Sequence, residues 1–318
     1  MSYTEFVTEV CERLDFPAEA RTCFLGVEKN LENNASFAAS LERLVRLFCK
    51  TDEISLHLLI PRVNRLAKKY KENKYTMDLV FVMHLAKRTR ERYREQGLSE
   101  ELFWNSMTDL KYKLLECMAC KNVPGTFVAG WNEGFLRLGR FTLGRFQYEP
   151  NGVYDGKDLQ LECGLTVKKG ARFLGFHIPS SGQPLTDDMR NGSYRMAYEH
   201  FKDWAGGDIV LLRTHSWLLY PGHREFLPEK SNILRFMDDF EIYESGDSDN
   251  FGDAWRVFNQ YAELPVTEWP EETSMRRAFK ARLLSGGKTG SGAGFIVMYN
   301  GENVTHKKGF FTDRVIDS

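Results

Sequence analysis

Apolar residues recur at helical spacing through the first third of the chain. Two apolar stripes with this i, i+3, i+4, i+7 pattern are Val63, Leu66, Ala67, Tyr70 and Phe103, Met107, Leu110, Leu114, Met118. Ser99 precedes the second stripe as an N-cap, and Pro61 is expected in the first turn of a new helix because proline interrupts a continuous one. The pattern predicts an all-helical domain over residues 1–122, with roughly five or six helices.

The pattern changes at the turn-rich run that begins at Asn122. Short apolar runs follow, and helical segments separate them. The expected strands cover residues 135–141, 144–148, 172–178, 208–218, 240–243 and 294–299. The expected helices cover 186–204, 231–240 and 272–284, with Thr186 and Ser231 as caps of the first two. This alternation predicts a second domain over residues 123–318, of α/β type with a mixed sheet, and an α+β class for the whole chain.

Composition narrows the class of protein. Hydrophobic residues make up 42% and charged residues 27%, as in ordinary globular proteins. The formal charge of -1 offers no net attraction to nucleic acid or anionic membrane, and no known nucleic-acid reader motif is present. Charged residues interrupt the N-terminus, the apolar runs are too short to span a bilayer, and the six cysteines are scattered. We therefore expect a soluble, cytoplasmic protein.

Three motifs imitate ligand sites without matching them. The run 286–289 ends like a phosphate-binding loop, but it precedes a strand, so we interpret it as a flexible hairpin or lid. The run 247–252 starts like a calcium loop, yet Phe251 and Phe258 replace oxygen ligands, which indicates a polar turn. Cys117 and Cys120 lie in an expected helix with no second cysteine pair. No metal site is predicted.

A strand, loop and helix over residues 173–201 form the most informative unit. The loop carries small residues, and its backbone N–H groups and the start of the following helix suit a pyrophosphate. Ser180, Ser181 and Gly182 are the candidate contacts, and Asn232, at the start of the next expected helix, is a fourth. An ordinary strand-to-helix connection is the competing interpretation.

Several short motifs, in their order along the chain, resemble those of a known protein family. The motifs that carry it are Leu138-Gly139-Arg140, the run 144–149, His177-Ile178-Pro179 with Gly182 and Pro184-Leu185, Ser216-Trp217-Leu218-Leu219, and Leu227-Pro228 with Ser231-Asn232-Ile233. Together they resemble a bacterial family that joins a helical N-acyltransferase N-terminal domain to a GNAT-like C-terminal domain. The resemblance implies a mixed, mostly antiparallel sheet and transfer of an acyl group from an acyl-CoA or acyl-carrier thioester to a small-molecule amine.

Acyl transfer to an amine requires a base for the amine proton and donors for the thioester oxygen. His177, Glu149 and His215 stand at the ends of expected strands and are the catalytic candidates, with His177 ranked first because it borders the loop. Gln147 and Ser216 are weaker candidates for polar groups in the same cleft. Each histidine could equally be a hydrogen-bonded core residue.

Two further questions concern partners and turnover. Between Arg62 and Arg94 there are eleven basic and three acidic residues, an excess of eight. This run is either a solvated helix face or a docking surface for an acidic acyl carrier protein.

The usual GNAT pyrophosphate loop, Arg/Gln-x-x-Gly-x-Gly/Ala, is missing, because Gly182 is the only glycine between His177 and Thr186. The alternative function is therefore a non-catalytic module that binds a small molecule or a protein on a degenerate GNAT fold.

Overall fold

The chain divides into two compact units. The computed structural model describes residues 1–317 and separates Met1–Phe141 from Thr142–Ser318. We describe each unit by itself. Among the described residues, no helix is both long and apolar enough to cross a membrane.

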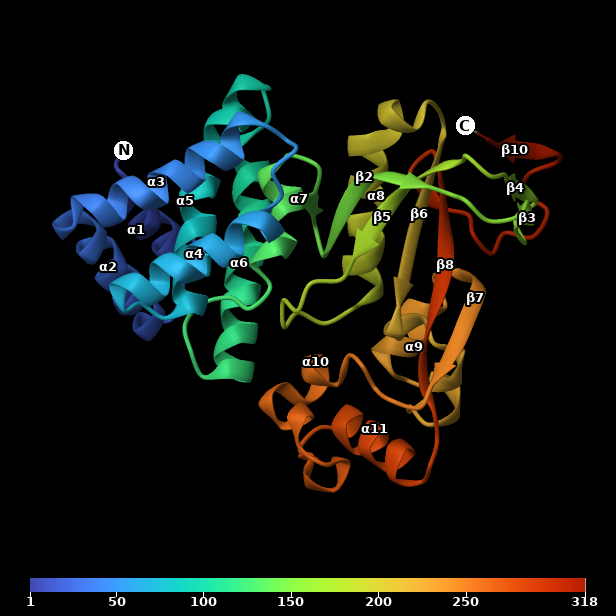
Figure 1. Ribbon diagram of the computed structural model, residues 1–318. Helices are drawn as coiled ribbons and strands as arrows, with labels where there is room; N and C mark the ends of the chain where they lie inside the picture. Colours follow the sequence, from blue (N-terminus) through green and yellow to red (C-terminus); the bar gives the residue numbers. More distant parts are fainter. Residues whose placement is uncertain (318) are drawn as a thin grey trace. The chain divides into compact units, whose positions relative to one another are not determined.

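Six long helices build the first unit (Figure 1). They are α1 (Tyr3–Arg13), α2 (Ala18–Asn33), α3 (Ala35–Lys50), α4 (Leu56–Tyr70), α5 (Lys74–Glu95) and α6 (Glu100–Lys121). The predicted apolar stripes lie on α4 and α6, and the Ser99 hydroxyl accepts a hydrogen bond of 3.0 Å from the backbone N–H of Leu102. The prediction of an all-helical domain is confirmed. The apolar stripe predicts a helix because each helix of a bundle buries one face against its neighbours.

Pro61 is an exception to the predicted helix starts. It lies inside α4, which begins at Leu56 behind Ser55, so the prediction that Pro61 opens a helix is wrong. Pro61 is on the exposed side of the helix, where water can hydrogen-bond to the carbonyl that loses its partner. The buried stripe through Leu59 and Val63 continues past it.

Residues 123–141 pack with the helical unit, although the sequence places the domain boundary at 122–123. The Thr76 hydroxyl donates to the Pro124 carbonyl oxygen at 2.7 Å, and the Thr126 N–H donates to the Tyr75 carbonyl oxygen at 3.0 Å. Gly125 lies so close to the Tyr75 backbone that a Cβ would stand 2.3 Å from its carbonyl carbon. A turn-rich sequence marks the end of a helix. The tertiary contacts of the segment that follows decide to which unit that segment belongs.

The same segment contains no strand before Phe141. A 3-10 turn (Ala129–Asn132) and α7 (Glu133–Leu136) occupy the place of the strand predicted at 135–141, which is therefore wrong. Phe135 and Leu136 are both buried from a single helical turn. Their adjacency in sequence gave an apolar run that is equally typical of a short strand.

The second unit is built on a mixed sheet. Its strands are β1 (Phe141–Leu143), β2 (Phe146–Val153), β5 (Arg172–His177), β6 (Ile209–Ser216), β7 (Glu241–Ser248), β8 (Thr289–Tyr299) and β9 (Glu302–Asn303). The order is β1-β2-β5-β6-β8-β7, with β9 beside β8. Within this sheet, β5 and β6 are the only parallel pair among those whose direction the structure describes; β2–β5, β6–β8, β7–β8 and β8–β9 are antiparallel. The predicted α+β class and mostly antiparallel sheet are confirmed.

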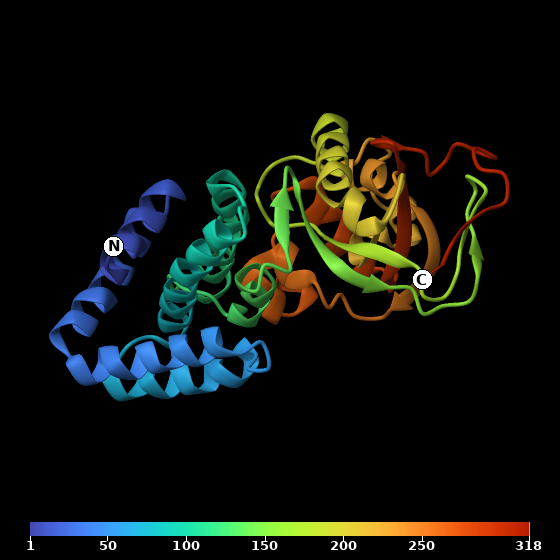
Figure 2. The same cartoon turned by 90° about the horizontal axis from the view of Figure 1, so that it is seen from above.

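Helices connect these strands. They are α8 (Asp187–Ala205), α9 (Asn232–Met237), α10 (Ala254–Phe258) and α11 (Ser274–Leu284), with short 3-10 turns at Trp217–Leu219, Pro221–Glu225, Asn259–Glu263 and Val266–Glu268. Thr186 and Ser231 cap α8 and α9 as predicted. α8 and α9 lie on the same face of the sheet (Figure 2), where Tyr194 and Phe236 pack against Phe176 with ring centroids 5.9 and 6.0 Å apart.

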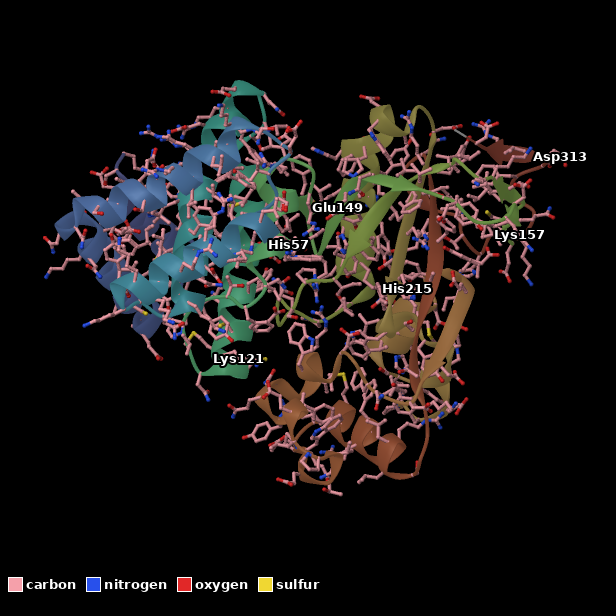
Figure 3. The ribbon with its side chains drawn as sticks, viewed as in Figure 1. His57, Lys121, Glu149, Lys157, His215 and Asp313 are labelled. Atoms are coloured by element: carbon pink, nitrogen blue, oxygen red, sulfur yellow. The ribbon has the colours of Figure 1, made fainter. Side chains whose placement is uncertain are left out.

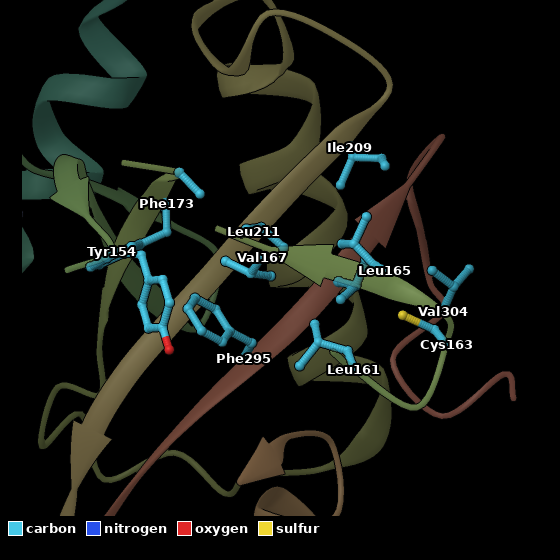
Figure 4. Close-up of a cluster of buried hydrophobic side chains, with 12 residues drawn as sticks. Tyr154, Leu161, Cys163, Leu165, Val167, Phe173, Ile209, Leu211, Phe295 and Val304 are labelled. Carbon is cyan, nitrogen blue, oxygen red and sulfur yellow. The ribbon is translucent and has the colours of Figure 1, made fainter. Parts of the chain in front are cut away.

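The opposite face is covered at one end by a small second sheet. It consists of β3 (Leu159–Gln160), β4 (Leu165–Val167) and β10 (Arg314–Ile316) in the order β10-β4-β3. Figure 4 shows Leu165 and Val167 on a strand that crosses over those carrying Leu211 and Phe295, in one buried apolar cluster. This cover protects one end of the face and leaves the end near His177 to the candidate site.

The imitation motifs have structural roles. The run 286–289 is the connection from α11 to β8, and not the predicted hairpin or lid: Gly286 has φ +76° and the Gly287 N–H donates to the Arg282 carbonyl oxygen at 2.9 Å, which closes the end of the helix. Asp247 and Ser248 belong to β7, and Cys117 and Cys120 lie in α6. No group of three or more metal-ligating side chains occurs among residues 1–317.

Candidate active site

The parallel strands β5 and β6 separate toward their carboxyl ends. Their register covers two pairs, Leu174 with Leu212 and Gly175 with Arg213. Both strands continue past the second pair, β5 to His177 and β6 to Ser216. Each strand keeps its antiparallel neighbour on the other side, β2 and β8 respectively. The centre of the sheet therefore opens between two strand ends that are held from outside.

His177 and Glu149 meet beside this opening. In the β2–β5 ladder His177 is opposite Gln147, and Glu149 is opposite Gly175. Gly175 has no side chain, so nothing from that position separates the two neighbours on this face. The His177 Nε2 atom lies 3.3 Å from Glu149 Oε1, with side chains 31% and 13% exposed. The pair is thus reachable from solvent while its carboxylate is mostly buried.

A third group fixes the carboxylate. The Asn151 side-chain amide donates to Glu149 Oε2 at 3.1 Å, while Oε1 is directed to His177. A carboxylate held in this way orients an imidazole. The arrangement is a histidine–carboxylate pair whose carboxylate is held by the Asn151 side chain.

His215 occupies the matching position on β6. It is two residues past Arg213, as His177 is two residues past Gly175, so by register both histidines stand on the same face of the sheet on either side of the opening. Glu149 and His215, labelled in Figure 3, come from two different strands of this sheet. His215 is exposed and its Nε2 atom is 3.1 Å from the Ser291 hydroxyl. The three predicted catalytic residues therefore share one face and one end of the sheet.

The loop after β5 joins His177 to α8. Ser180 and Gly182 are exposed and Ser181 is partly exposed; Gly182 has φ +73° and open space where a Cβ would be. The Ser181 hydroxyl accepts from the Gln183 N–H at 3.3 Å, and the Ser181 N–H donates to the Pro179 carbonyl oxygen at 2.8 Å. The loop is a compact turn that presents small side chains to solvent at the start of a helix of 19 residues.

Arg145 anchors this loop, and sequence analysis did not single it out. Its guanidinium donates to the Pro179 carbonyl oxygen at 3.1 Å and to the Gln183 carbonyl oxygen at 3.2 Å, from a side chain only 7% exposed overall. One residue thereby holds both ends of the candidate contact segment. Its place in the resemblance motif 144–149 was the only signal available in the sequence.

Arg190 holds the start of α8 in the same manner. It donates to the Leu185 carbonyl oxygen at 2.6 Å and forms an ion pair of 2.6 Å with Asp239, which also accepts from the Tyr194 hydroxyl at 2.8 Å. Burial lowers the pKa of Arg190, but its hydrogen bond to the Asp239 carboxylate raises the pKa above its usual value overall. The start of α8 and the segment after α9 are therefore tied by this ion pair. The predicted contact Asn232 is exposed as the first residue of α9.

Acidic side chains from other helices balance part of the positive charge of the basic run 62–94. Ion pairs within it reach glutamates of other helices: Arg88 to Glu42 at 3.5 Å, Arg90 to Glu9 at 2.7 Å, Arg94 to Glu100 at 3.5 Å, and Arg90 also to Glu100. A count along the chain omits these partners because they come from α1, α3 and α6. The structure gives no support to an acyl carrier protein that docks on this run.

The separated parallel strands, the loop into α8 and the mixed sheet define the second unit as a GNAT-like domain. Residues 140–296 match the model of the GNAT-like C-terminal domain, and residues 5–138 match that of the N-acyltransferase N-terminal domain. The chain belongs to the GNAT-like N-acyltransferase family that combines these two domains.

Solved acyltransferases share this fold. The chain is similar to an acyltransferase in complex with decanoyl-CoA and teicoplanin, with a TM-score of 0.70, 22% identity, and coverage of 92% of this chain and 87% of the other. It is also similar to an acyltransferase mutant in complex with octanoyl-CoA, with a TM-score of 0.69, 20% identity, and coverage of 92% and 88%. No curated protein matches the chain significantly. At these identities the likeness shows a common fold.

Proposed function

We propose that this protein is an N-acyltransferase that moves an acyl group from an acyl-CoA to an amine on a small molecule. The observation that carries the proposal is the His177–Glu149 pair, 3.3 Å apart, at the open end of the parallel strands β5 and β6. The solved proteins of this fold that bind decanoyl-CoA or octanoyl-CoA support the choice of donor.

The donor is an extended chain with amide groups and a diphosphate. An extended amide-containing chain can pair with the edges of two separated strands, as peptides do when they add to a sheet. The diphosphate is then directed to the N–H groups of the loop at Ser180, Ser181 and Gly182 and to the start of α8. This placement brings the thioester toward the strand ends that carry His177 and His215.

The chemistry follows from the groups at that position. The amine nitrogen attacks the thioester carbonyl carbon, the carbon–sulfur bond breaks, and an amide and CoA result. His177 takes the proton that the amine loses, and Glu149 stabilises the imidazolium that forms. His215, across the opening, is the second candidate for contact with the reacting groups, with its Nε2 held toward Ser291.

Thermal denaturation with CoA thioesters tests the donor. Acetyl-CoA, octanoyl-CoA and decanoyl-CoA are compared with free CoA at saturating concentration. A ligand present at one hundred times its Kd stabilises the folded chain by about 2.7 kcal/mol. We expect a shift of this size with at least one thioester; the absence of any shift with all four compounds contradicts the proposal.

Arg145 provides a second test, through the loop that it anchors. Arg145→Met removes two charge-assisted hydrogen bonds to the loop carbonyls, each worth about 1.5–3 kcal/mol. We expect the Kd for acyl-CoA to rise at least tenfold because the loop loses its bound shape. Isothermal titration measures the Kd, and Arg172→Met, an exposed arginine at the other end of β5, is the matched control. An unchanged Kd in Arg145→Met excludes the loop from donor binding.

The loop also favours a second candidate function. Its single glycine, Gly182, and the two carboxylates Asp187 and Asp188 in the first turn of α8 make this helix start less attractive to anions than a glycine-rich one. A GNAT-like module that binds a small molecule without turnover fits these features. Amide formation in a reaction that contains acyl-CoA and a panel of amines, followed by mass spectrometry, distinguishes the enzyme from the module.

A further inference from the structure

A pocket of about 650 Å³ lies in the helical unit, and none of the residues of the candidate active site lines it. Its walls come from α4, α5 and the segment 127–140, with the apolar side chains Ile60, Phe127 and Trp131. His57, labelled in Figure 3, forms part of the rim, and its ring packs so closely on Gly130 that a Cβ there would stand 2.6 Å from it. The volume is in the range that small organic ligands occupy.

Two of the three charged residues around the pocket are engaged. The Glu133 carboxylate accepts the backbone N–H of Leu56 at 2.9 Å and so closes the start of α4. The Arg140 guanidinium stacks on Trp131, 3.8 Å from the ring centroid, and donates to the Trp131 carbonyl oxygen at 2.8 Å. Neither group is available to a ligand without loss of a structural contact.

Asp78 differs from both. Its side chain is on the second turn of α5, and the residue is only 5% exposed. Its Oδ1 atom has no hydrogen-bond partner among the residues that the structure describes. A buried carboxyl oxygen without a partner is costly, so such a group points to a ligand or to a special role.

We propose that this pocket binds an organic ammonium ion that carries an aromatic or other flat apolar group, with the Asp78 carboxylate as its counter-ion. The ammonium supplies the donors that Asp78 lacks, and the apolar body packs against Phe127, Ile60 and the indole of Trp131. The proposal goes beyond acyl transfer, since it requires neither an acyl donor nor His177.

The charge of Asp78 also makes binding depend on pH. Burial raises its pKa to about 7, against a smaller lowering effect of Lys74. The other titratable or charged groups that face it or share the pocket are His57, Glu133, Arg140 and Cys117. An ammonium ion binds the ionised carboxylate, so affinity rises with pH. Between pH 5.5 and pH 8.5 the ionised fraction grows about thirtyfold for a pKa near 7. A variant of Asp78 separates its contribution from that of the other groups.

The experiment compares 2-phenylethylamine with the uncharged 2-phenylethanol, without any acyl donor present. Ligand-observed NMR titration gives the Kd of each compound for the full chain. We expect the amine to bind at least tenfold more tightly than the alcohol at pH 8.5, and the advantage to shrink at pH 5.5. In Asp78→Asn, which keeps the shape of the side chain, the advantage disappears while the alcohol binds as before.

Glu53→Gln is the matched control, because Glu53 is an exposed carboxylate of the same unit outside the pocket. It retains the wild-type preference for the amine. The proposal is overturned if the amine does not bind, if it binds no better than the alcohol, or if Asp78→Asn retains the preference. Circular dichroism of each variant establishes that it is folded. Failure of this test leaves the acyl-CoA proposal intact, since the two use different residues.

Discussion

His177→Ala is expected to lower kcat for amide formation by about a hundredfold to ten-thousandfold, the usual contribution of a general base. The Kd for acyl-CoA is expected to stay within about twofold of wild type, because the proposed role of His177 is at the reacting amine and not at the diphosphate. Glu149→Gln keeps the shape of the side chain and removes its charge, so it lowers kcat less. Steady-state kinetics with isothermal titration of the donor separates the two effects.

Another histidine–carboxylate pair of the same unit, which is more exposed, supplies the control. His306 Nδ1 lies 3.2 Å from Glu162, with side chains 45% and 46% exposed, away from the opening of the sheet. His306→Ala is expected to leave kcat unchanged. A full rate in His177→Ala, or an equal loss in His306→Ala, removes His177 from the catalytic role and leaves His215 as the candidate.

Asp78→Asn is expected to stabilise the helical unit at pH 8.5, by up to about 4 kcal/mol. Burial raises the pKa of Asp78 from the ordinary aspartate value of 3.8 to about 7 in the folded chain. The folded state therefore holds this proton more tightly than the unfolded state, and stability falls as pH rises from about 4 to about 7. About three pKa units correspond to about 4 kcal/mol, and asparagine carries no charge to bury.

Urea denaturation followed by far-ultraviolet circular dichroism measures this effect, since the helical unit dominates that signal. Wild type and Asp78→Asn are compared at pH 4.5 and pH 8.5, with Glu53→Gln as the exposed control. The gain of Asp78→Asn over wild type is expected to be small at pH 4.5 and large at pH 8.5. An equal difference at both values shows that Asp78 is already compensated in the folded chain.

Regular patterns in the sequence were sufficient for much of the fold. The stripe through Val63 and Ala67 and the cap at Ser99 depend on neighbours within one or two turns, so periodicity predicts them. The start of β8 does not follow such a pattern. The run 286–289 favours a hairpin or lid there, but in the structure β8 begins at Thr289, and its Gly290 and Gly292 each let another backbone approach: a Cβ would stand 2.2 Å from the Gly246 carbonyl oxygen and 2.3 Å from that of Leu219.

Some residues of the candidate site could be predicted from the sequence, and others could not. His177 and Glu149 were visible because alternation predicts the strands beside them, although Glu149 lies within β2 and not at its end. Arg145 was not, since its partners Pro179 and Gln183 are more than thirty residues away along the chain. The pocket at Asp78 was also missed, although an acidic residue directly before the apolar run 79–83 is an available signal. Contacts between distant segments decide both cases.

Hydrogen exchange with and without decanoyl-CoA tests whether the donor binds between the ends of β5 and β6, because it locates the donor on the sheet. We expect slower exchange on binding in the end of β5 and its loop, residues 176–183, and in the end of β6, residues 214–216. His177→Ala, which spares donor binding, shows the same protection. Binding of decanoyl-CoA without protection at these two strand ends contradicts donor binding at the opening of the sheet.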